Sequence, residues 1–196
     1  MLYWDGMRPR LTIKYGKLLE PFFHCYIEQK YPGFEIPDEA AVKAKVRLFR
    51  NEWSRYRDRF FDGIESFGLE FSRNRIDVHV VSATDRDMSS PLIMRSRYDA
   101  REFVSVLFHE LLHNLFGEVG LVRGYGEETS TSQRHVYVFA MLEFLFRDVM
   151  GEPERIEEEK GKSGPGRNPE YYRAWEIVER DGYHAILEGM ETRQNH

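Results

Sequence analysis

Two histidines four residues apart, with a glutamate directly after the first, are the residues of this sequence best suited to chemistry. The stretch reads HELLH and contains His109, Glu110 and His113. On a helix, side chains at positions i and i+4 lie on one face, one turn apart, so both imidazoles can reach the same metal ion. Glu110 points in a neighbouring direction, from which its carboxylate can take a proton from a water molecule on the metal. The spacing predicts a catalytic site with one zinc ion per chain and Glu110 as general base.

Catalytic zinc normally takes three protein ligands and leaves one position for water, so a third ligand is needed. His135 is our first choice, because it lies 22 residues after His113, near the start of the next expected helix, and the loop between them is long enough to reverse the chain. Glu143 is the second choice, since a carboxylate on an otherwise apolar face needs a partner. That partner is zinc, a ligand histidine, or Arg147 at i+4. Other downstream carboxylates are Glu118, Glu127 and Glu128.

The HELLH stretch at residues 109–113 resembles the zinc-binding motif of the zincin metallopeptidases. The resemblance implies that His109 and His113 are zinc ligands and that Glu110 is the general base. The local order of strands, motif helix, loop and second helix extends it over residues 75–150. In the gluzincin branch the third ligand is a glutamate on a helix after a comparable interval, and His135 occupies roughly that place. Metzincins are disfavoured, because their motif continues with glycine and histidine where this chain has Phe116 and Val119.

These residues favour a zinc-dependent peptidase, in which metal-activated water attacks a peptide carbonyl and Glu110 passes the proton to the leaving amine. The developing oxyanion needs a further donor, for which Tyr125, Arg123 and Tyr137 are candidates. The substrate would be a peptide or protein, held in extended form at the edge strand near residues 90–96.

Three alternatives remain open. One is a zinc amidohydrolase acting on a small amide, because the motif specifies carbonyl hydrolysis better than it specifies a protein substrate. Another is a non-catalytic zinc-binding interaction module, against which the intact Glu110 argues. The third is that His109 and His113 are partly buried core histidines bonded to carbonyl groups. His24, His79, His184 and His196 lack metal-ligand spacing and are interpreted as structural or surface residues.

The elements that must position this site are mainly helices. Hydrophobic spacing predicts helices over residues 15–33, with a break or a start at Pro21, and over residues 37–61, 98–117 and 134–151. A helix or helix pair is expected over residues 170–190, around Asp181-Gly182. Residues 75–83 and 91–97 are rich in strand-forming residues, and residues 118–133 are expected to be irregular. The predicted fold class is α+β: mainly helical and zincin-like, with a small β-sheet and the motif on the active-site helix.

The length of 196 residues, with 41% hydrophobic and 31% charged residues, indicates one globular domain with an appendage. We expect a zincin-like domain over residues 1–151, a charged linker over 152–169 and a helical extension over 170–196. The net charge of −5 gives no reason to expect nucleic acid or a membrane as partner, and the residues indicate no particular oligomeric state. The single cysteine, Cys25, and the lack of any signal-like or membrane-spanning apolar run favour a cytoplasmic location.

Overall fold

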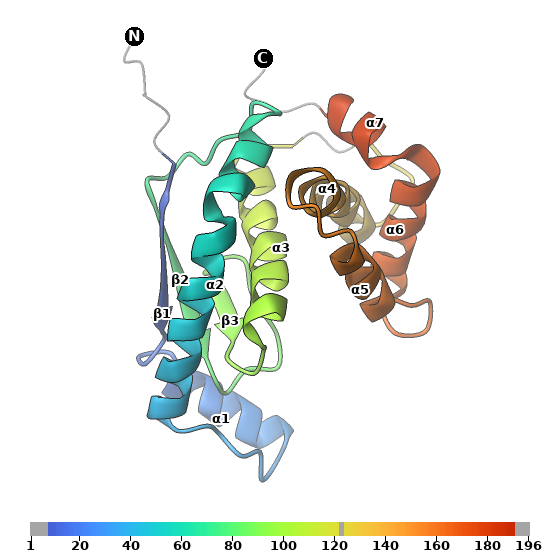
Figure 1. Ribbon diagram of the computed structural model, residues 1–196. Coiled ribbons are helices and arrows are strands. Elements are labelled where there is room, and N and C mark those ends of the chain that lie inside the picture. The colour runs from blue at the N-terminus through green and yellow to red at the C-terminus, as the bar shows by residue number, and fades with distance from the viewer. Residues whose placement is uncertain (1–7, 122–123, 191–196) are drawn as a thin grey trace. The chain divides into compact units, whose positions relative to one another are not determined.

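The computed structural model describes residues 8–121 and 124–190, and the backbone divides into two compact units (Figure 1). Unit 1 comprises residues 1–57 and 73–110, and unit 2 comprises residues 58–72 and 111–196. The chain passes from one unit to the other inside helices α2 (Glu39–Glu65) and α3 (Ala100–Glu118). These boundaries do not coincide with the predicted limits at residues 151 and 169.

Unit 1 is built on a small parallel sheet with the strand order β1-β2-β3. Its strands are β1 (Arg10–Tyr15), β2 (Arg75–Val81) and β3 (Ile93–Arg95). Ile13 pairs with Val78, and Val80 pairs with Met94, so buried apolar side chains are aligned across the sheet. The strands expected over residues 75–83 and 91–97 are confirmed in shorter form. β1 was not predicted, because it lies just before a segment expected to be helical.

The outer edge of β3 is partly paired by the chain itself. Met88 and Ile93 exchange two backbone hydrogen bonds of 2.9 Å. A peptide that added to this edge would therefore have to compete with Met88 for the backbone groups of Ile93.

Helix α1 (Glu20–Lys30) begins next to Pro21, as one of the two predicted alternatives requires, and packs Phe23 and Ile27 against the sheet. The part of α2 in unit 1 lies along the sheet and is fixed there by the Arg50 guanidinium, whose Nε donates to the carbonyl oxygen of Ile13 at 2.7 Å. This predicted helix is confirmed, together with its buried stripe: Val42, Val46, Phe49, Trp53, Tyr56 and Phe60.

The motif helix α3 starts as predicted. The Asp99 carboxylate accepts a hydrogen bond of 2.7 Å from the backbone N–H of Glu102, which caps the first turn. Within unit 1, Phe103 stacks on Phe49 with ring centroids 3.9 Å apart. Phe108 and Trp53 form a T-shaped pair with ring centroids 6.0 Å apart. These aromatic contacts fix the orientation of the half of the helix that leads into the motif.

Unit 2 consists of helices packed around α4 (Ser130–Phe144), which contacts both α6 and α7 (Figure 1). The segments that follow α4 are the π-helical turn η1 (Leu145–Val149), α5 (Glu154–Lys162), α6 (Pro169–Asp181) and α7 (Tyr183–Glu188). The helix expected over residues 134–151 is thus α4 followed by η1. The expected helix pair near Gly182 is confirmed, with a break at that residue where φ is 80°.

The charged stretch predicted as a linker contains α5, which packs into unit 2. Arg155 and Ile156 are both fully buried there. The segment expected to be a charged linker over residues 152–169 thus contains a helix, two of whose side chains belong to the core. Within the described ranges, no helix combines the length and the apolar character needed to cross a membrane.

Candidate metal centre

Helix α3 places His109 and His113 on one face, one turn apart. The other faces of the helix are packed in the core, so rotation of the helix about its axis is prevented. The fully buried residues around the motif are Leu107, Phe108, Leu111, Leu112 and Leu115. Both histidines are only half-buried, as expected for side chains that point away from the core.

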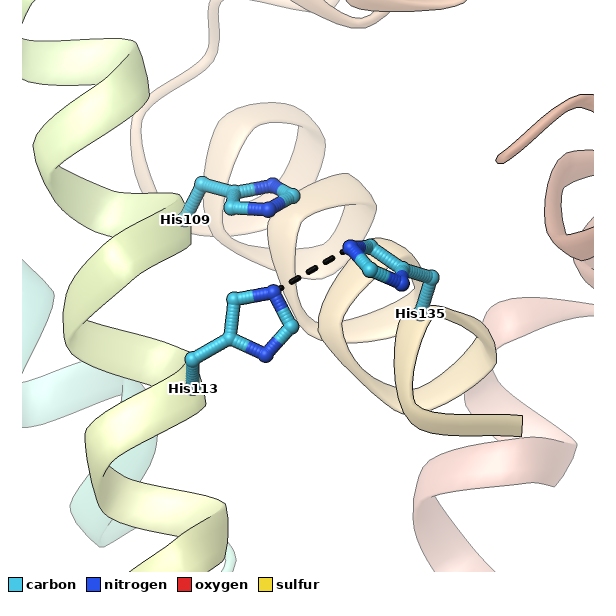
Figure 2. Close-up of side chains that lie close together, drawn as sticks. All are labelled: His109, His113 and His135. Carbon is cyan, nitrogen blue, oxygen red and sulfur yellow. Dashed lines mark hydrogen bonds between the residues drawn. The ribbon is translucent and has the colours of Figure 1, made fainter. Parts of the chain in front are cut away.

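Helix α4 adds His135 to this pair (Figure 2). The Nε2 atoms of His113 and His135, both in unit 2, lie 3.2 Å apart. One ligand atom from each of His109, His113 and His135 can be chosen so that all three lie within 4.8 Å of one another. Among the residues that the structure describes, this is the group of side chains that could hold a metal ion.

The geometry fits a zinc ion. Two nitrogen ligands on one tetrahedral zinc lie about 3.4 Å apart, given Zn–N distances of about 2.1 Å. The 3.2 Å between Nε2 of His113 and Nε2 of His135 is close to this value. Three imidazoles form a donor set typical of catalytic zinc, which keeps one position for water.

A backbone carbonyl fixes which nitrogen of His135 faces the other histidines. The Nδ1 atom of His135 lies 2.7 Å from the carbonyl oxygen of Thr131. Because a carbonyl oxygen only accepts hydrogen bonds, Nδ1 carries the proton, and the lone pair of neutral His135 is on Nε2. A ligand histidine is commonly oriented in this way by a hydrogen bond from its second nitrogen.

Burial keeps two of these imidazoles neutral. Burial, together with the neighbouring His135 and Arg134, lowers the pKa of His113 to about 3. The pKa of His135 is also lowered, mainly by burial, although the hydrogen bond to Thr131 opposes the shift. Metal ions bind the neutral form of histidine, so no proton has to be removed from these rings near neutral pH.

Glu110 is buried, and its carboxylate accepts a hydrogen bond of 2.7 Å from the Ser89 hydroxyl to Oε2. Burial and the charge of Asp87 raise the pKa of Glu110, and the Ser89 hydrogen bond opposes this shift. The resulting pKa is about 7. A carboxylate with this pKa can both accept and return a proton near neutrality. Ser89 was not identified from the sequence, because it lies in the loop between β2 and β3, far from the motif along the chain.

The loop that carries Ser89 is itself held by a buried ion pair. The Arg95 Nε donates to Asp87 Oδ2 at 2.8 Å, and the Tyr98 hydroxyl donates to the same oxygen at 2.5 Å. The Asp87 carboxylate is only 6% exposed. The position of Ser89 relative to Glu110 is therefore determined by contacts within unit 1.

The other proposed ligands do not belong to the histidine group. Glu143 pairs with Arg147, whose Nε donates at 2.8 Å, as in the alternative given above. Glu128 accepts from Arg173 at 2.8 Å. Glu118 accepts from the backbone N–H and the hydroxyl of Ser72, at 2.8 and 2.7 Å, and Glu127 is exposed. The structure does not bring these carboxylates into the histidine group.

Two of the expected oxyanion donors, Tyr125 and Tyr137, have hydrogen-bond partners of their own. The Tyr125 hydroxyl donates to Asp181 at 3.3 Å, and burial together with that carboxylate raises the pKa of Tyr125 to about 12. The Tyr137 hydroxyl accepts a hydrogen bond of 3.0 Å from the backbone N–H of Gly124. Arg123 lies outside the described residues.

The remaining histidines that the structure describes do not belong to this group of metal-binding side chains. His24 faces Glu28 on α1 at 3.8 Å, and His184 pairs with Asp148 at 3.0 Å. His79 lies on β2, and His196 falls outside the described residues. Comparison of the chain with protein-family models, with curated proteins and with solved structures found no significant match.

Proposed function

We propose that this chain is a zinc-dependent metallopeptidase. The observation that carries the proposal is the meeting of His109, His113 and His135, with Glu110 directly after the first of them. A purely structural site would have no use for a buried carboxylate beside its ligands. The zincin resemblance of the HELLH stretch points to the same reaction.

The three imidazoles would hold the zinc ion. Zinc bound there would act as a Lewis acid that acidifies water and polarises the scissile carbonyl. Each ligand is prepared for this role by the fold: His109 and His113 by the packed helix α3, and His135 by its hydrogen bond to Thr131.

Glu110 is assigned the proton transfers. Its carboxylate would accept a proton from the attacking water and deliver it to the nitrogen of the leaving amine. The Ser89 hydroxyl holds Oε2 of Glu110 by a 2.7 Å hydrogen bond, so the carboxylate is oriented before the substrate arrives. Burial of Glu110 excludes bulk water from this proton path.

The test begins with protein purified without a histidine tag. Metal analysis of the wild type, His113→Ala, His135→Ala and the control His24→Ala gives the zinc content per chain. We expect about one zinc in the wild type and in the control, because catalytic zinc sites hold a single ion, and loss of zinc in the two ligand variants. Zinc retained in His135→Ala would refute the three-histidine site.

Activity is then measured by mass spectrometry on an unbiased peptide mixture and on a panel of small amides. Zinc-loaded wild type should cleave peptides, and Glu110→Gln should bind zinc but lose cleavage. Cleavage restricted to small amides would favour an amidohydrolase. A zinc-loaded protein that hydrolyses neither class would refute the proposed reaction.

A further inference from the structure

The imidazole of His135 is covered by an aromatic ring from α6. The ring centroids of Tyr171 and His135 lie 4.0 Å apart, with an angle of 34° between the planes. Phe139, one turn further along α4, lies 5.3 Å from the same imidazole and 5.7 Å from Tyr171. The two aromatic rings restrict rotation of the His135 ring, since a close-packed aromatic ring cannot turn without displacing its neighbours.

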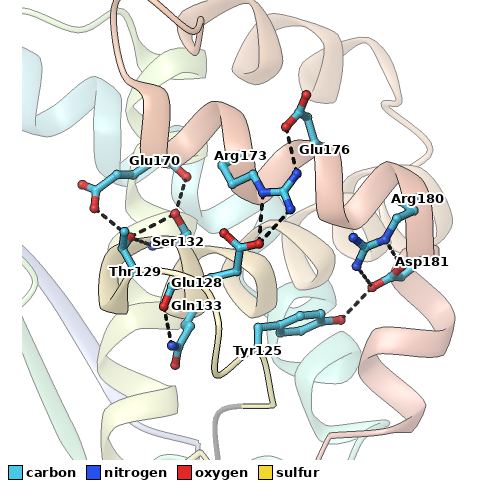
Figure 3. A network of polar contacts seen from close by, with 10 residues as sticks. All are labelled: Tyr125, Glu128, Thr129, Ser132, Gln133, Glu170, Arg173, Glu176, Arg180 and Asp181. Carbon is cyan, nitrogen blue, oxygen red and sulfur yellow. Dashed lines mark hydrogen bonds and ion pairs between the residues drawn. The ribbon is translucent and has the colours of Figure 1, made fainter.

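Helix α6 is fastened to the start of α4 on both sides of Tyr171 in the sequence (Figure 3). The hydroxyl of Thr129, the N-cap residue of α4, donates to Glu170 Oε1 at 2.7 Å, and the Ser132 hydroxyl donates to the Glu170 carbonyl oxygen at 3.1 Å. The Arg173 guanidinium donates two hydrogen bonds to Glu128, at 3.0 and 2.8 Å.

These contacts act on the same turn that orients His135. Thr129 and Ser132 flank Thr131, whose carbonyl oxygen lies 2.7 Å from Nδ1 of His135. A shift of α6 would therefore disturb two restraints on the imidazole at once: the ring contact with Tyr171 and the position of the Thr131 carbonyl. Both restraints lie within unit 2.

From this arrangement we infer that Tyr171 is a positioning residue for the third metal ligand, and that α6 is part of the metal centre. Its ring holds the His135 imidazole so that Nε2 faces Nε2 of His113, which brings the metal ligands together before an ion binds. The inference rests on the zinc site of the proposed function, but not on the peptidase reaction.

Zinc affinity tests the inference through three variants. Tyr171→Ala removes the ring, Tyr171→Phe keeps the ring without the hydroxyl, and Tyr172→Ala is the control, because Tyr172 is the exposed neighbour on the same helix. Zinc dissociation constants are measured by competition with a chromophoric chelator on metal-free protein. We expect about a tenfold or greater loss of affinity in Tyr171→Ala, retained affinity in Tyr171→Phe and unchanged affinity in Tyr172→Ala.

Cobalt substitution gives a second readout that a role in stability alone would not change. The visible spectrum of cobalt-loaded Tyr171→Ala should differ from that of cobalt-loaded Tyr172→Ala, because only Tyr171→Ala removes the ring that holds the His135 imidazole. Equal zinc affinity of Tyr171→Ala and Tyr172→Ala would overturn the inference, as would a loss in Tyr171→Phe as large as in Tyr171→Ala. If Tyr171→Ala does not fold by circular dichroism, Tyr171→Leu replaces it in the same comparison.

The outcomes separate this inference from the proposed reaction. Zinc-loaded wild type that cleaves nothing, together with weakened binding in Tyr171→Ala, would refute the peptidase and support the role of Tyr171. An active wild-type enzyme, together with unchanged zinc affinity in Tyr171→Ala, would support the peptidase and refute the role of Tyr171. Wild type that binds no zinc would overturn both.

Discussion

Replacement of Arg155 should strongly destabilise the protein, because this charged side chain lies inside unit 2. It is 1% exposed, and its Nε donates to Glu152 Oε2 at 2.5 Å. The guanidinium carbon also lies 5.3 Å from the ring centroid of Phe146. The segment around Arg155 is therefore held by an ion pair and by packing.

The expected loss follows from these contacts. Arg155→Ala removes two methylene groups beyond Cβ, which contribute about 1.6 kcal/mol at about 0.8 kcal/mol each. The lost hydrogen bond between charged groups contributes about 1.5 to 3 kcal/mol. The Glu152 side chain is 25% exposed, so water can solvate its carboxylate after the substitution. The free energy of unfolding should fall by about 3 to 5 kcal/mol in Arg155→Ala, and by less in Arg155→Met, which keeps most of the apolar volume.

Urea denaturation followed by far-UV circular dichroism measures this change. Arg167→Ala is the control, because Arg167 is an exposed arginine in the loop between α5 and α6. Surface substitutions of this kind usually change stability by less than about 0.5 kcal/mol. If Arg155→Ala were no less stable than Arg167→Ala, residues 152–162 would be a loose linker after all and the packing argument would fail.

Three further substitutions or treatments test the framework of the site. Gly63→Ala should destabilise the chain by about 1 kcal/mol, since overpacking outweighs the gain in helix propensity: a Cβ there would lie 2.5 Å from Leu145 Cδ2. A stabilised variant in urea denaturation would contradict this. Ser89→Ala should lower kcat of the proposed peptidase by about tenfold or more with little change in KM, because Glu110 loses its orienting hydrogen bond; Ser89→Thr is the matched control, and equal kcat values would count against the role of Ser89. Zinc at about 100 times its Kd should stabilise the wild type by about 2.7 kcal/mol, and a similar rise in thermal stability in His113→Ala would show that zinc binds elsewhere.

The motif helix could be predicted because its signals are local, and the loop length indicated that His135 returns toward it. The i, i+4 spacing places His109 and His113 on one face, and Asp99 marks where the helix begins. A loop of suitable length then brings His135 back toward them. Only the last of these steps depends on tertiary structure, and there the need of zinc for three ligands restricted the choice to a few side chains.

The strand β1 and the residue Ser89 could not be found in this way. β1 pairs with a strand more than sixty residues later, in the register Arg10 with Arg75, and no local pattern specifies such a partner. Ser89 acts through a hydrogen bond to Glu110 that depends on the Asp87–Arg95 pair holding the loop. A serine in a polar loop carries no sequence signal that distinguishes this role from an ordinary turn.

Charge composition was a misleading guide to the region after α4. Residues 152–162 are rich in glutamate and lysine, which is typical of a solvated segment. Arg155 is nevertheless buried, because Glu152 neutralises it and the ring of Phe146 lies against its guanidinium. Specific partners such as these offset the preference of a charged side chain for water, and composition averaged over a segment cannot show them.

The C-terminal helices were expected to be an extension of the catalytic domain. The aromatic contacts of α6 instead make it part of the packing around α4. Phe139 on α4 stacks on Trp175 of α6 with ring centroids 4.2 Å apart and planes 4° apart. The same pair of helices carries the contact between His135 and Tyr171. Trp175, which packs against α4, and Tyr171, whose ring covers His135, therefore come from the same helix. A change in α6 that loosens this core should also displace the His135 imidazole, so the stability of unit 2 and the zinc affinity of the proposed site should vary together.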